Sequence, residues 1–241
     1  MADQVRGRCA VVTGASKGIG YAIAEALAGA GGNVVISARN EAEVQEAARR
    51  LGEVSEGEVV GVAADVRRLE DVRRMIGTAS ERFGGVDILV NNAGVGGFAP
   101  IDRIDPERWN QIIETNLTGV YYCCHEAIPS MRERGGGWII NIASLAGKNP
   151  LAGGTAYNAS KFGLVGFSEA LMLDVREYDI RVNYIMPGSV ATYFNGHTPS
   201  EADAWKIQPE DIAQIVMDLL AFPGRTLPSR VEVRPSRPPK R

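Results

Sequence analysis

The 241-residue chain predicts an α/β fold in which seven parallel strands form one sheet with helices on both faces. Three observations predict this fold. Short apolar runs rich in β-branched residues alternate with longer segments of helical period, and a glycine-rich turn joins the first run to the first helical segment. Because parallel strands need a crossover connection, the alternation indicates strand-helix-strand units. Hydrophobic residues make up 45% of the chain, so we expect residues 1–241 to form a single, doubly wound domain.

Each predicted strand is a short apolar run that ends at a polar or glycine-containing turn. In chain order, we expect strands at 8–13, 33–37, 58–63, 87–91, 138–143, 180–186 and 230–234. We expect helices at 18–30, 41–51, 69–83, 107–134, 155–178 and 209–221. Pro129 lies inside the longest of these helices, and its missing backbone N–H predicts a kink or a break there.

Two segments near the end of the chain fit neither pattern. Residues 193–208 separate the sixth strand from the last helix, and we expect them to form a substrate lid, because such loops lie above the ligand-binding edge of a sheet. Residues 235–241 form a basic, proline-rich tail. The tail is either a frayed end or a contact for an acidic partner or a neighbouring subunit.

Composition argues against several classes of protein. The chain has 26 basic and 29 acidic residues and a formal net charge of -3, which predicts no general attraction to nucleic acid or to an anionic membrane. No apolar run approaches the ~20 residues that span a bilayer. The first residues lack the apolar core of a signal peptide, so we expect a cytoplasmic protein.

The cysteines and histidines predict no metal site. Cys9, Cys123 and Cys124 lack metal-ligand spacing and are interpreted as reduced packing residues. His125 and His197 show no neighbours in the sequence that indicate a metal site or a general base.

The glycine-rich turn predicts a phosphate cradle. Residues 13–20 read Thr-Gly-Ala-Ser-Lys-Gly-Ile-Gly, directly after the first strand and at the start of the first helix. This placement brings backbone N–H groups and the positive end of a helix to one point, where a pyrophosphate can bind. The G-x-x-x-G-x-G spacing is not that of a P-loop, and a merely tight connection is the alternative. The expected contacts are Gly14, Ser16, Lys17, Gly18, Ile19 and Gly20.

Two basic side chains, Lys17 and Arg39, indicate which dinucleotide the chain binds. After the second strand the chain reads Ser37-Ala38-Arg39-Asn40, without the acid that bonds the ribose hydroxyls in NAD-binding proteins. Arg39 and Lys17 could instead converge on the 2′-phosphate of NADP, and the arginine could stack on adenine. Two solvated surface cations are the alternative. The sequence therefore predicts NADP(H).

Taken together, further motifs resemble the compact, single-domain branch of the short-chain dehydrogenase/reductase family, nearest to 3-oxoacyl-[acyl-carrier-protein] reductases. The resemblance covers about residues 7–192 and implies a Rossmann-type fold and a homo-oligomer, either a tetramer or a dimer built on two long helices. The motifs are TGASKGIG at 13–20, Asp65-Val66, Asn91-Asn92-Ala93-Gly94, Asn116, Ser144, Tyr157-x-x-x-Lys161 and Pro187-Gly188. The resemblance implies cofactor contacts from Asp65 and Val66 at the adenine, from Asn92, Ala93, Gly94, Pro187 and Gly188, and from Val190 and Thr192 at the nicotinamide carboxamide.

Tyr157 and Lys161 carry the predicted chemistry. Four residues apart on a helix, they lie on one face, and an ammonium together with an oxidised nicotinamide should lower the pKa of the phenol. Tyr157 would then exchange a proton with the substrate oxygen, and Ser144 would hydrogen-bond that oxygen where charge develops. A surface helix pair and a turn cap are the alternatives for these residues. By resemblance, Lys161 bonds the nicotinamide ribose and Asn116 extends a proton relay from Lys161 to solvent.

The predicted substrate contacts are Ser144, Tyr157, Tyr193 and Phe194, although the two lid residues could instead be packing anchors. After Thr192 the chain departs from the 3-oxoacyl reductase pattern. From the predicted catalytic residues and the family resemblance, we expect a ketone or 3-oxoacyl reductase. A non-enzymatic NADP-binding regulator on the same fold is the alternative. A sugar epimerase or dehydratase is disfavoured, because too little chain follows residue 192 for a sugar-binding domain.

Overall fold

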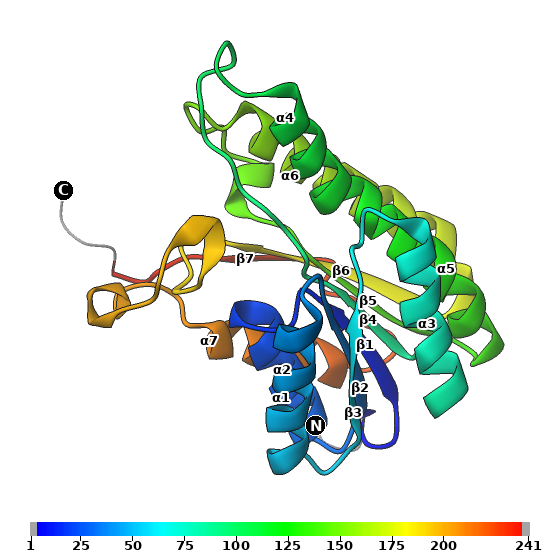
Figure 1. The fold of residues 1–241 in the computed structure, drawn as a ribbon. Coiled ribbons are helices and arrows are strands. Elements are labelled where there is room, and N and C mark those ends of the chain that lie inside the picture. The colour runs from blue at the N-terminus through cyan, green and yellow to red at the C-terminus, as the bar shows by residue number, and fades with distance from the viewer. Residues whose placement is uncertain (1–3, 238–241) are drawn as a thin grey trace.

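Seven parallel strands form the central sheet of the computed structural model, which describes residues 4–237 (Figure 1). Their order across the sheet is β3-β2-β1-β4-β5-β6-β7, which confirms the predicted fold class. The strands are β1 (Cys9–Thr13), β2 (Asn33–Ala38), β3 (Val59–Ala63), β4 (Ile88–Asn91), β5 (Gly137–Ile142), β6 (Ile180–Pro187) and β7 (Arg230–Val233). Every predicted strand boundary lies within one residue of the observed boundary.

Helices cover both faces of the sheet (Figure 1). One face is packed by α1 (Gly18–Gly29), α2 (Glu41–Val54) and α7 (Pro209–Ala221), and the other by α3 (Leu69–Phe83), α5 (Gly119–Glu133) and α6 (Thr155–Val175). Successive strand residues point to opposite faces, so Val11 and Val12 of β1 belong to different apolar clusters. Both side chains are fully buried, which explains why these strands are apolar without alternation.

The helix predicted at 107–134 is divided, although not at Pro129. It consists of α4 (Pro106–Ile113), a π-helical segment at Glu114–Thr118, and α5, which continues through Pro129. The expectation of a break at the proline was therefore wrong. The irregular backbone lies around Asn116, a predicted site residue, and π-helical turns inside helices often occur at functional sites.

The crevice of the sheet lies between β1 and β4. From β1 the chain moves outward to β2 and β3, and then returns to the other side of β1 as β4. The connections that leave these two strands diverge above their carboxyl ends, where open α/β sheets bind ligands. The glycine-rich turn after Thr13 and the Asn92-containing turn after Asn91 meet at this point.

Residues 193–208 form a loop whose two ends are held together. Val190 and Ile207 form an isolated parallel bridge, and Ala191 N–H donates to the Ile207 carbonyl at 2.9 Å. Short 3-10 turns lie at Phe194–Gly196 and Glu201–Asp203. A capping box between Ser200 and Asp203 starts the second turn.

Of the predicted basic tail, residues 238–241 lie outside the described residues. Pro235, at the start of this tail, packs close to Gly188. A Cβ built on Gly188 would lie only 3.3 Å from Cδ of the proline. Among residues 4–237, no helix is both long and apolar enough to cross a membrane. All three cysteines are buried free thiols, and burial raises their pKa values.

Candidate active site

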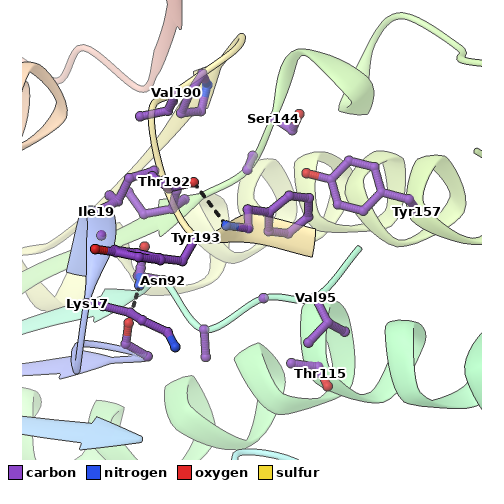
Figure 2. Close-up of a pocket in the computed structure, with 18 of the residues that line it drawn as sticks. Lys17, Ile19, Asn92, Val95, Thr115, Ser144, Tyr157, Val190, Thr192 and Tyr193 are labelled. Atoms are coloured by element: carbon purple, nitrogen blue, oxygen red, sulfur yellow. Dashed lines mark hydrogen bonds between the residues drawn. The ribbon is translucent and has the colours of Figure 1, made fainter. Parts of the chain in front are cut away.

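A cleft of about 1210 Å³ opens at the carboxyl ends of the strands and is lined in part by the 193–208 loop (Figure 2). That is large for a small-molecule pocket and leaves room for a dinucleotide beside a substrate. Most of the predicted site residues line it: Gly14, Ser16, Lys17, Gly18, Ile19, Arg39, Asp65, Val66, Asn92, Ala93, Gly94, Ser144, Tyr157, Lys161, Pro187, Gly188, Val190, Thr192, Tyr193 and Phe194. Gly20 and Asn116 are buried behind its wall.

The glycine-rich turn is shaped for close approach. Gly14 has φ +64, and a Cβ there would lie 2.8 Å from Cα of Ala93. A Cβ on Gly20 would lie 2.5 Å from Nδ2 of Asn92. No described side chain caps the start of α1, so its first backbone N–H groups remain for a ligand at the positive end of the helix. The turn therefore fits a pyrophosphate.

Asn92 fixes this turn to the end of β4. Its Nδ2 donates to the carbonyl oxygens of Thr13 at 3.0 Å and of Gly14 at 2.9 Å. In return, Oγ1 of Thr13 accepts the backbone N–H groups of Asn92 and Ala93, each at 3.0 Å. The two turns are thus one rigid unit, which gives Asn92 a supporting role beneath the cleft.

Polar side chains gather at the glycine-turn end of the cleft. Lys17, Arg39 and Asn40 line it, together with Ser16 and Glu43. Glu43 of α2 was not anticipated from the sequence. Its carboxylate accepts a long hydrogen bond of 3.4 Å from Ser16 Oγ and lies 3.8 Å from Lys17 Nζ.

Asp65 and Val66 lie beside this end of the cleft, after β3. The Asp65 carboxylate pairs with the Arg67 guanidinium at 2.5 Å, and hydrogen bonds from Arg67 lower the pKa of the acid. The acid is therefore charged, and Arg67 holds its side chain in place.

Tyr157 and Ser144 lie close together in the cleft, with the phenol oxygen of Tyr157 near the Ser144 side chain (Figure 2). Ser144 Oγ accepts the backbone N–H of Ala146 at 3.1 Å, so the hydroxyl caps the short turn after β5. An oxygen that accepts here still has its own proton to donate, and the capping and substrate interpretations are compatible. Burial raises the pKa of Tyr157, while the Ser144 hydroxyl opposes the rise. The lowered pKa of Tyr157 expected from an ammonium together with an oxidised nicotinamide is not found for the protein groups alone, because desolvation of the buried phenol outweighs the Ser144 hydrogen bond.

Lys161 lies one helical turn after Tyr157 on α6. Its Nζ is 5.9 Å from the centre of the Tyr157 ring and donates to the carbonyl oxygen of Ile142 at 2.9 Å. The side chain is buried, and burial lowers the pKa of Lys161 to about 8. Its charge is thus sensitive to pH near the physiological range.

Asn116 holds the loop that follows β4. Its Oδ1 accepts from Val95 N–H at 2.8 Å, while Nδ2 donates to the Val95 carbonyl at 2.9 Å and to Ser160 Oγ at 3.0 Å. These bonds use both ends of the amide for positioning. The relay from Lys161 to solvent through Asn116 stays a prediction.

Pro187, the last residue of β6, borders the cleft, as do Gly188, Val190 and Thr192 after the strand. Thr192 reaches the glycine-rich turn, because a Cβ on Gly18 would lie 3.5 Å from its side chain. Thr192 Oγ1 also accepts the N–H of Phe194 in a long 3.4 Å bond, which directs the start of the 193–208 loop.

The two aromatic residues at the start of the 193–208 loop contact different parts of the cleft. Lys17 Nζ lies 5.6 Å from the centre of the Tyr193 ring, so Tyr193 covers the glycine-turn end. The Phe194 ring lies 5.7 Å from that of Tyr157. The ring of Phe98, which the sequence did not single out, lies 5.6 Å from that of Tyr157. Both phenylalanines reach the cleft from loops, and no sequence periodicity marks such positions.

A buried carboxylate organises the 193–208 loop. Asp203 Oδ2 lies 2.6 Å from Nε2 of His197, and Oδ1 lies 2.6 Å from Nζ of Lys206. These contacts, led by Lys206, lower the pKa of Asp203 to about 2. His197 therefore has a carboxylate partner, contrary to the interpretation from the sequence, and His125 likewise contacts Glu126 at 3.1 Å. The described residues hold no group of three His, Cys, Asp or Glu side chains that could bind a metal ion.

Comparisons with known proteins agree with this geometry. The family model described as short chain dehydrogenase matches residues 8–203. An uncharacterized oxidoreductase of Staphylococcus saprophyticus is 36% identical over 232 residues, which cover 96% of this chain and 99% of the relative. A D-beta-hydroxybutyrate dehydrogenase of Cupriavidus necator is 38% identical over 189 residues, covering 78% of this chain and 72% of the relative.

Solved structures share the fold over nearly their whole length. An alcohol dehydrogenase from the archaeon Thermococcus sibiricus, complexed with 5-hydroxy-NADP, has a TM-score of 0.90 and 30% identity, and the match covers 97% of this chain and 99% of the other. A metagenomic short-chain oxidoreductase in complex with NADP has a TM-score of 0.84 and 37% identity, with the same coverage.

Proposed function

The chain belongs to the short-chain dehydrogenase/reductase family of oxidoreductases, and on that premise we propose that it interconverts a ketone and a secondary alcohol with NADP(H). The observation that carries the proposal is the arrangement of Ser144, Tyr157 and Lys161 on the wall of a cleft that also contains the glycine-rich turn. The two similar structures bound to NADP or to a modified NADP support the choice of cofactor.

The glycine-rich turn and the N-terminus of α1 would hold the pyrophosphate, while Lys17 and Arg39 would face the 2′-phosphate. Among the described residues, Arg39 has no carboxylate within ion-pair distance, so its charge is not already neutralised by a salt bridge. Asp65 and Val66 would border the adenine, and Val190 and Thr192 the nicotinamide carboxamide. When bound, NADPH supplies the hydride for the carbonyl carbon and becomes NADP⁺.

Tyr157 would donate its proton to the carbonyl oxygen as the C=O π bond breaks, giving an O–H bond and a phenolate that solvent protonates again. Its raised pKa keeps the phenol protonated at neutral pH, which suits ketone reduction. Ser144 would donate a hydrogen bond to the same oxygen, where negative charge develops. Lys161 would place a positive charge beside the phenolate, and Asn116 would position the loop that carries Val95.

We propose that the substrate is a ketone or a 3-oxoacyl compound and that the loop at 193–208 forms a lid that covers it.

We also propose a homo-oligomer, either a tetramer or a dimer. Exposed apolar side chains of Tyr121 on α5 and of Phe162 and Leu173 on α6 support it. Light scattering on the purified chain tests the oligomeric state. The single-domain organisation and the cytoplasmic location stay predictions.

A screen of ketones and 3-oxoacyl thioesters, followed by the loss of NADPH absorbance, tests the function. We expect NADPH-dependent reduction of at least one ketone class. Tight NADPH binding without oxidation of NADPH by any member of the panel would contradict the enzymatic proposal and favour a non-enzymatic NADP-binding regulator.

A further inference from the structure

Two phenylalanines contact the phenol that the proposed function makes the proton donor. Phe98 and Phe194 lie 5.6 and 5.7 Å from the centre of the Tyr157 ring, and both rings are tilted against it. Although apolar, Phe98 is 47% exposed and Phe194 is 39% exposed, and both line the cleft. Leu151, also 47% exposed, lines the same cleft. Exposed apolar surface in a cleft is suited to the apolar part of a ligand.

The ring of Phe194 has a defined seat. A Cβ built on Gly96 would lie 2.6 Å from Cζ of Phe194 and 2.7 Å from Cε1, so the ring packs directly on the glycine backbone. Arg108 donates to the carbonyl oxygen of Gly96 and holds that loop. Packing on Gly96 therefore holds the Phe194 ring beside Tyr157.

The cations of the cleft are already engaged or lie at its other end. Lys206 and His197 share the buried carboxylate of Asp203, each at 2.6 Å. Lys161 is buried and bonded to the Ile142 carbonyl. Lys17 and Arg39 belong to the glycine-turn end. Among the described residues that line the cleft, none offers an unpaired cation beside the phenylalanines for a substrate carboxylate.

Resting on the proposed function, we propose that the substrate carries an uncharged aromatic group next to its carbonyl, held in contact with Phe98 and Phe194. Aromatic rings contact one another favourably in tilted arrangements such as those seen here. A short, charged 3-oxo acid would leave its carboxylate beside apolar rings without a partner, which is costly.

Acetophenone and acetoacetate, each reduced with NADPH, test this inference. We expect a higher kcat/KM for acetophenone. Replacing Phe98→Ala or Phe194→Ala should lower that kcat/KM about tenfold, mainly through KM, because each change removes an aromatic contact. Phe98→Leu and Phe194→Leu should restore part of it. Phe222→Ala is the matched control, because Phe222 is 41% exposed and does not line the cleft.

A higher kcat/KM for acetoacetate would overturn the inference and leave the proposed function standing, as would an unchanged KM for acetophenone in both alanine variants. Reduction of neither ketone nor of any other carbonyl, with NADPH binding intact by titration, would instead overturn the proposed function and this inference with it.

A second, independent observation concerns Glu43. Its carboxylate contacts Ser16 and Lys17, of which Lys17 is expected at the 2′-phosphate, and it lines the same end of the cleft as Arg39. A phosphate bound there would either draw Lys17 away from Glu43 or lie close to a second negative charge. Both outcomes cost binding free energy.

We infer that Glu43 sets the strength of NADPH over NADH selection by competing with the 2′-phosphate for Lys17. Glu43→Gln keeps a hydrogen-bond acceptor for Ser16 and removes only the charge. Calorimetric titration should show NADPH binding about fivefold more tightly to this variant, with NADH binding unchanged.

Glu41→Gln is the matched control, because Glu41 lies in the same first turn of α2 but outside the cleft, and it loses the same charge near the helix N-terminus. An unchanged NADPH affinity in Glu43→Gln, or an equal gain for NADH, would overturn the role of Glu43. If the parent chain itself binds NADH more tightly than NADPH, the proposed cofactor choice fails as well.

Discussion

The Nζ atom of Lys161 lies 2.9 Å from the carbonyl oxygen of Ile142, so the ammonium of α6 is fixed to the end of β5. Ser144 follows the same strand end two residues later, and Tyr157 lies one helical turn before Lys161. A single junction between a strand and a helix therefore sets the relative positions of the three groups proposed to act on the substrate oxygen.

This junction predicts a pH profile. Ketone reduction needs a protonated Tyr157 and a charged Lys161, and burial lowers the pKa of Lys161 to about 8. Both groups hold their protons at lower pH, so kcat/KM for reduction by the NADPH complex should be flat below neutral pH and fall as the pH rises through about 8. Steady-state kinetics across pH measure it. A rate that climbs through this range would contradict the assignment.

Arg39→Asp should weaken NADPH binding about tenfold or more, because it removes a charge-assisted contact and places an acid beside the 2′-phosphate. NADH binding should improve or stay the same, as measured by titration with each dinucleotide. Arg103→Asp makes the same charge change outside the cleft and should leave both affinities unaltered. An equal loss for both dinucleotides in Arg39→Asp would mean that this arginine does not select the phosphate.

Gly20→Ala should disrupt the junction between the two turns, since its Cβ would lie 2.5 Å from Nδ2 of Asn92 and 2.6 Å from the Gly14 carbonyl oxygen. We expect the free energy of unfolding to fall by about 2 kcal/mol, together with weaker NADPH binding. Chemical denaturation measures the first effect. Gly52→Ala on α2 meets nothing within 4 Å and should not destabilise the fold. Equal stability of the two variants would contradict the close fit at Gly20.

Asp203→Asn should loosen the lid, because His197 and Lys206 would lose their shared carboxylate. The KM for a ketone should rise several-fold while NADPH affinity changes less. Kinetics at saturating NADPH measure the effect, with Glu201→Gln, an exposed acid of the same turn, as the control. A variant with the parent KM would show that the lid does not depend on this carboxylate.

The strands were predictable because each is a short apolar run with a turn at its end, and burial on both faces leaves no other position for such a run. The glycine-rich turn and the Tyr157-Lys161 pair were likewise visible, since both depend on spacing along one local element. The division of the long helix around Asn116 could not be predicted from the sequence, because a π-helical turn changes backbone hydrogen bonding without changing the apolar pattern.

Other parts of the cleft depend on contacts between segments that are distant in sequence. Phe98 and Glu43 reach it from a loop and from the start of α2, and their chain positions alone do not show where they point. The pairing of His197 with Asp203 is more local, and the Ser-x-x-Asp capping pattern at 200–203 was the signal that could have indicated it.

The most direct test replaces Tyr157 by phenylalanine, which removes one oxygen and keeps the ring that contacts Phe98 and Phe194. NADPH affinity by titration and kcat for the best ketone are then measured on the same preparation. We predict an affinity within about twofold of the parent and a kcat at least about a hundredfold lower, because the proton donor is gone. Undiminished kcat in Tyr157→Phe would contradict the proposal that this phenol drives the reaction.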